Sequence, residues 1–203
     1  MTDLDRLISG PQKEVLRKRS NIIGIGLILH AWGTIAICTW VAAFFPNIFT
    51  LLLAGMLIGS RQLGLLILMH DAAHGILFKS PKLNHFFGQW LCGLPMFADL
   101  TTYRPYHLKH HKHVLTKEDP DLLLTGHYPI PKASLKRKLL RDISGTSGIA
   151  QRTHQLKDSI KGTFGTKIDC LHHFWKKIGR SLLCNIMIFF LMSLLGSWWL
   201  FFI

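Results

Sequence analysis

The sequence predicts an all-α integral membrane protein, and three observations support this fold class. Three apolar runs are each long enough to cross a bilayer as a helix. A net charge of +13 accompanies 49% hydrophobic residues, and most of that charge lies between the second and third runs. Six of the twelve histidines occur in two short motifs that follow the second run. This segregation of apolar and charged residues is untypical of a soluble globule.

The first element is a polar N-terminal segment, residues 1–20, which holds five Lys/Arg and three acidic residues. Flanks rich in Lys and Arg remain on the cytoplasmic side of a membrane. The segment 75–180 is even more basic, with eighteen Lys/Arg and seven acidic residues. We therefore expect the N-terminus and residues 75–180 to lie together in the cytoplasm.

The second element is a transmembrane hairpin over residues 21–74. Its first span, Ile22–Phe45, has no charged residue, and its second span, Ile48–Met69, has only Arg61. Both exceed the roughly 20 residues that a membrane-crossing helix needs. The uncharged link at Pro46 and Asn47 is expected to turn on the outer side.

The cytoplasmic segment and a third span complete the predicted order. Within residues 75–180, the apolar patch Phe86–Leu94 is too short to cross and is expected to lie at the membrane interface. The third span, Ser181–Ile203, has no charged residue. Basicity beside three spans is better explained by topology and anionic lipid than by nucleic acid, so no nucleic-acid partner is expected.

The two histidine motifs carry the functional signal. In H70-D-A-A-H-G75 the histidines are four residues apart, so both rings project from one face of a helix. In H107-L-K-H-H-K-H113, His110 and His111 follow His107 at the same helical spacing. Neutral imidazole binds iron, zinc and copper well. Five such ligands are more than the three or four protein ligands of a typical zinc site, which favours two metal ions or one crowded site.

Other interpretations remain for these motifs. Taken alone, the first motif is compatible with chance or interfacial packing, and the second with a solvated or lipid-facing patch. Their predicted location on the same side of the membrane favours a metal site. A zinc-protease motif would place Glu after the first histidine, whereas Asp71 stands there.

The two histidine motifs and their flanking residues resemble those of a known protein family. The stretches R61-Q-L-G-L-L-I-L-M-H-D-A-A-H-G75, Y103-R-P-Y-H-L-K-H-H-K-H113 and D119-P-D121 resemble the integral-membrane fatty acid desaturases. R141-D-I-S-G-T-S-G148 is similar to a segment of the bacterial branch. The resemblance covers roughly residues 55–150.

The resemblance implies a four-span helical protein that holds two iron ions at its cytoplasmic face. It also implies O₂ as co-substrate, an external electron donor such as ferredoxin or a small cytochrome, and removal of hydrogens from a lipid acyl chain. No catalytic residue is expected beyond the metal ligands. Carried over residue by residue, the implied ligands are His70, His74, His107, His110 and His111.

The sequence departs from the family in its C-terminal part, because the family's fourth span and third histidine box are absent. We therefore expect a C-terminally truncated desaturase that is inactive alone. A substitute box, D169-C-L-H-H173, is the less favoured reading, since it precedes the third span. The alternative functions are a related di-iron hydroxylase or carotenoid-modifying oxygenase, and a non-catalytic membrane metal-binding protein.

Overall fold

The computed structural model describes residues 10–16, 18–122, 129–160 and 166–202, and every regular element in these ranges is helical. Three of the helices are long and apolar enough to cross a membrane: α3 (Asn21–Phe44), α4 (Ile48–Ala73) and a continuous helix over Lys167–Leu194. Few side chains on these helices are buried, as expected for helices that contact lipid. The predicted all-α membrane fold class is confirmed. The chain forms two compact units, Met1–Cys92 and Gly93–Phe202.

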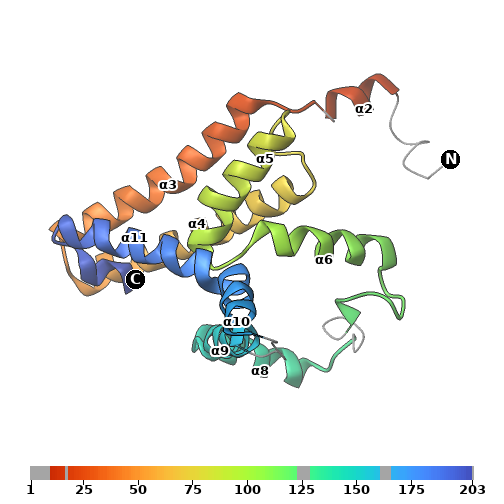
Figure 1. The fold of residues 1–203 in the computed structure, drawn as a ribbon. Coiled ribbons are helices and arrows are strands. Elements are labelled where there is room, and N and C mark those ends of the chain that lie inside the picture. Colours follow the sequence, from red (N-terminus) through yellow and green to blue (C-terminus); the bar gives the residue numbers. More distant parts are fainter. Residues whose placement is uncertain (1–9, 17, 123–128, 161–165, 203) are drawn as a thin grey trace. The chain divides into compact units, whose positions relative to one another are not determined.

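The first unit is built on a helical hairpin that follows the short helix α2 (Gly10–Leu16). Helix α3 begins after Ser20, whose side chain accepts a hydrogen bond from the amide of Ile23. Asn47 then starts α4 with a capping box, in which its side chain accepts from the amides of Phe49 and Thr50. These caps satisfy amides that have no partner inside a helix. The bounds of the two helices are close to those of the predicted spans. The two helices pack side by side (Figure 1).

A return segment after α4 packs onto the start of α3. It contains α5 (Pro81–Phe87) and the π-helical turn η1 (Gly88–Gly93), which together hold the predicted apolar patch except its last residue, Leu94. Phe78 is completely buried, and the buried amide of Asn84 bonds both the N–H and the C=O of Phe78. The indole N–H of Trp32 on α3 donates to the carbonyl of Leu91 at 2.9 Å. The return segment that follows α4 is thereby hydrogen-bonded to the N-terminal half of α3.

The second unit contains the second histidine motif and the third candidate span. Its elements are η2 (Leu94–Met96), α6 (Leu100–His113), α8 (Lys132–Ile143), α9 (Thr146–Ile160), α10 (Lys167–Phe174), η3 (Trp175–Gly179), α11 (Arg180–Leu194) and η4 (Trp198–Phe202). Helices α10 and α11 are continuous through the π-helical turn η3. The buried amide of Asn185 on α11 donates to the carbonyl of Leu94, and η2 packs on α11.

The third apolar run differs from the single helix expected over Ser181–Ile203. Helix α11 ends at Leu194, and the chain resumes as the short 3₁₀ helix η4. Gly196 has a φ of +71°, its amide bonds the carbonyl of Ser193, and the amide of Ser197 bonds that of Met192. This hydrogen-bond pattern is a Schellman motif, which ends a helix at a glycine in the left-handed region. The apolar stretch therefore contains a helix end that its hydropathy does not reveal.

Two glycines of α3 give a matched test of the packing in the first unit. A Cβ at Gly24 would lie 2.5 Å from the carbonyl oxygen of Leu77 and 2.9 Å from the ring of Phe78, whereas a Cβ at Gly26 meets nothing within 4 Å. Gly24→Ala should destabilise the protein by about 1–3 kcal/mol through overpacking. Gly26→Ala should be neutral or slightly stabilising, because Ala is the better helix former. Thermal unfolding in detergent measures both, and equal midpoints would contradict this account of the close approach.

Candidate metal centre

His70 lies in the last turn of α4, His74 is the C-cap residue of that helix, and Gly75 follows directly. The amide of Gly75 bonds the carbonyl of Ala72, and the amide of Ile76 bonds that of Asp71. Gly75 has a φ of +70°, so this helix end is also a Schellman motif. The final G of the H-D-A-A-H-G run therefore has a structural role: it stops the helix while both imidazoles still share one face.

The two imidazoles of this turn are close neighbours. Their ring centroids are 4.7 Å apart at an interplanar angle of 63°, and each offers a nitrogen within 4.8 Å of the other. The Nδ1 atom of His70 lies 3.2 Å from a carboxylate oxygen of Asp71. The helical spacing predicted from the first motif is confirmed, and Asp71 is available to orient the His70 ring.

Helix α6 presents the second motif, and a buried carboxylate fixes its first turn. Asp99 is the N-cap, accepting hydrogen bonds from the amides of Thr101 and Thr102. Its other oxygen lies 2.6 Å from a guanidinium nitrogen of Arg180, which also donates to the hydroxyl of Thr101. Arg180 is the first residue of α11. The start of the histidine-bearing helix is thus tied to the start of α11, within the third candidate span.

The three predicted ligands of the second motif lie together on α6. The Nε2 atoms of His107 and His111 are 3.0 Å apart, and their rings meet edge to face. The ring centroid of His110 lies 5.7 Å from that of His111 and 6.3 Å from that of His107. Tyr103 stacks on His107 one turn earlier. The expected shared face of this motif is confirmed.

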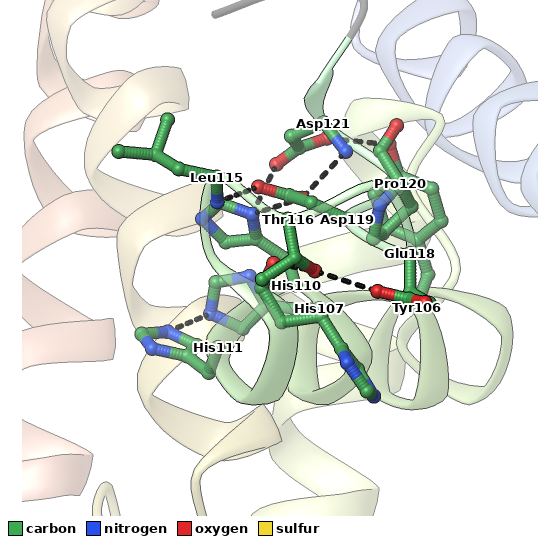
Figure 2. A network of polar contacts seen from close by, with 11 residues as sticks. Tyr106, His107, His110, His111, Leu115, Thr116, Glu118, Asp119, Pro120 and Asp121 are labelled. Carbon is green, nitrogen blue, oxygen red and sulfur yellow. Dashed lines mark hydrogen bonds and ion pairs between the residues drawn. The ribbon is translucent and has the colours of Figure 1, made fainter.

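A network of acidic side chains holds His110 (Figure 2). The Nδ1 atom of His110 lies 2.7 Å from Oδ1 of Asp119, a carboxylate with no exposed surface, and 3.4 Å from Oδ2 of Asp121. Asp119 also accepts hydrogen bonds from the amides of Leu115 and Asp121, each at 2.8 Å. The hydroxyl of Tyr106 donates to Asp121. The loop after α6 thus returns to the middle of that helix.

These contacts shift the ionisation of the groups involved. The hydrogen bond from His110 is the main reason that the pKa of Asp119 is lowered to about 2. The same bond raises the pKa of His110 above its ordinary value. The hydrogen bond to Asp121 raises the pKa of Tyr106 to about 12. At neutral pH Asp119 is therefore an ionised, acceptor-only group, and Tyr106 keeps its proton.

The donor set fits a transition metal such as iron. Imidazole nitrogens are suitable ligands for iron, zinc and copper. Two nitrogens bound about 2.1 Å from one ion at a right angle lie about 3 Å apart, which matches the separation of the His107 and His111 Nε2 atoms. His70 and His74 belong to the first unit, and the other three predicted ligands belong to the second.

The substitute motif around Asp169 has a structural role. Asp169 completes a capping box at the start of α10, where its carboxylate accepts from the amide and hydroxyl of Thr166. His172 and His173 lie in the last turn of the same helix. The carboxylate of this motif is thus committed to capping.

Sequence reasoning missed the roles of two acidic residues, Asp99 and Asp119. Asp99 carries a readable signal, because Asp is a favoured N-cap and Asp99 directly precedes the helix. Asp119 carries a weaker one, since its contact with His110 depends on the conformation of the loop between them.

Comparison with known proteins agrees with this architecture. A family model described as fatty acid desaturase matches residues 43–203. The chain is also 36% identical over 104 residues to dihydrorhizobitoxine desaturase of Bradyrhizobium elkanii, a match that covers 50% of the chain and 29% of that relative. No solved structure matches the chain. Because the family model spans most of the sequence and includes both histidine motifs, the chain belongs to the fatty acid desaturase family.

Proposed function

We propose that this chain is the iron-binding part of a membrane desaturase that introduces a double bond into a lipid acyl chain. Family membership supports the reaction class, and three helices suited to crossing a membrane support an apolar substrate. Iron, when bound, would supply the O₂ chemistry that breaks an unactivated C–H bond, which side chains alone cannot do. The chain's own residues would bind and orient the metal and the substrate.

The observation that carries this proposal is the 3.0 Å separation of the His107 and His111 Nε2 atoms. This contact is a hydrogen bond when one of the two nitrogens carries a proton. With both nitrogens unprotonated, the same separation suits two ligands bound to one ion at a right angle. We propose that His70, His74, His107, His110 and His111 all contribute ligands to a di-iron centre.

The reaction requires an electron donor as a partner. Removing two hydrogens from an alkyl chain releases two electrons, whereas reducing O₂ to two waters consumes four. An external donor must therefore deliver the other two electrons, and a ferredoxin or a small cytochrome would serve. The two protons of the balance come from solvent.

A second candidate substrate comes from the relative, whose name identifies dihydrorhizobitoxine as the compound it desaturates. The 36% identity over 104 residues favours testing this compound beside acyl lipids. Membrane lipids and added dihydrorhizobitoxine, each analysed for a new double bond, distinguish the two candidates.

The proposed ligands can be tested by metal binding rather than by turnover. Residues 1–203, purified in detergent, should bind Co²⁺ as a spectroscopic stand-in for Fe²⁺ and show ligand-field absorption bands. Replacing any of the five histidines with Ala should lower Co²⁺ affinity by more than the roughly 10–100-fold that loss of an outer-sphere partner costs. His85→Ala and His154→Ala are matched controls and should bind normally. Normal affinity in His107→Ala would remove the second motif from the site.

The proposed orientation places residues 75–180 in the cytoplasm because of their excess of Lys and Arg. In a variant without the four native cysteines, a cysteine introduced at Lys132 should react with an impermeant maleimide only after the cells are permeabilised. A cysteine at Pro46, in the turn between α3 and α4, should react in intact cells. The reverse labelling pattern would invert the proposed topology.

A further inference from the structure

We propose that Asp119 is a positioning residue that holds His110 in the tautomer with its proton on Nδ1 and so presents Nε2 to the metal. This inference rests on the proposed metal centre, but its central claim concerns the protein before any metal binds. Asp119 itself would not touch metal or substrate.

The geometry around Asp119 supports a carboxylate that only accepts hydrogen bonds. Its Oδ1 atom receives the amide of Asp121 and faces His110 Nδ1, and its Oδ2 atom receives the amide of Leu115. A neutral His ring has one N–H and one lone pair. Because both oxygens of Asp119 already accept amide N–H groups, Asp119 faces the ring as an acceptor, so the ring atom facing it must be the one that carries the N–H. The lone pair of neutral His110 is therefore on Nε2.

The loop that delivers Asp119 is held in an unfavourable conformation. Leu115 has a φ of +60°, which is uncommon for a residue other than glycine, asparagine or aspartate. Such a conformation persists only where surrounding contacts enforce it. The amide of Leu115 donates to Asp119, so the carboxylate that contacts His110 also stabilises the turn that brings it there.

Asp121 and Tyr106 support this arrangement from the other side. The Tyr106 hydroxyl on α6 holds the carboxylate of Asp121, which lies 3.4 Å from His110 Nδ1. The loop is thus attached to α6 at two positions one turn apart, Tyr106 and His110. The His110 ring is fixed before metal arrives, which lowers the ordering cost of binding.

The tautomer is testable in metal-free protein. Residues 1–203 labelled with ¹⁵N-histidine give separate signals for protonated and unprotonated ring nitrogens, and His110→Ala identifies the signals of His110. At a pH where His110 is neutral, its Nδ1 should carry the proton. A proton on Nε2 would overturn the inference, and this result needs no Asp119 variant to fold.

Metal affinity supplies the second test, as a double-mutant cycle. Asp119→Asn leaves only one acceptor oxygen for three N–H groups, and it should lower Co²⁺ affinity by about 10–100-fold. In a His110→Ala background the same change should alter affinity by less than about twofold, because it no longer has a ring to orient. An equal loss in both backgrounds would show that Asp119 acts only on folding.

Glu118→Gln is the matched control for loss of one negative charge in the same loop. Glu118 bonds the hydroxyl of Thr116 and is exposed. Its replacement should leave both the His110 signals and Co²⁺ affinity unchanged, and an effect equal to that of Asp119→Asn would contradict a specific role for Asp119. If none of the five His→Ala variants lost Co²⁺, the proposed metal centre would fail, and the NMR result would still decide the tautomer.

Discussion

The ion pair between the buried carboxylate of Asp99 and the partly buried guanidinium of Arg180 is the interaction on which the second unit depends. Asp99 has one oxygen directed to the first amides of α6 and the other to the first residue of α11. A charge buried without a partner is costly, so neither side chain can be removed without penalising the other. The direction of the helix that carries the three predicted ligands of the second motif is therefore set at the start of α11, within a candidate membrane span.

The histidines themselves lie at the other ends of their helices. The first pair occupies the final turn and the C-cap of α4, and the second motif occupies the final turns of α6. Both helices are terminated by local hydrogen bonding rather than by a change in hydropathy: a left-handed glycine closes α4, and the loop that reaches Asp119 follows α6. The first pair is thus placed where the apolar helix α4 ends, whereas the second motif lies on a helix that is itself rich in polar residues.

The sequence predicted much of the fold because its signals are local. The spans α3 and α4 were visible as uncharged runs interrupted at Pro46 and Asn47, and the shared faces of the histidines followed from helical spacing. The end of α11 was not predicted, because the third span was read from its uncharged length alone, although Gly196 followed by Ser197 is a local helix-end signal. The contact of Asp119 with His110 was missed because it is not a local signal. It depends on the left-handed conformation of Leu115, a residue that has no preference for that region.

The helix end at Gly75 makes the first histidine motif intolerant of insertions. One extra residue between His70 and His74 would add about 100° to the angle between the rings around the helix axis, which would grow from about 40° to about 140°. One extra residue between His74 and Gly75 would lengthen the helix by a residue and move the start of the return segment that packs on α3. The length of the segment from His70 to Gly75 is therefore fixed. Its two alanines, Ala72 and Ala73, are buried, so only small side chains can replace them.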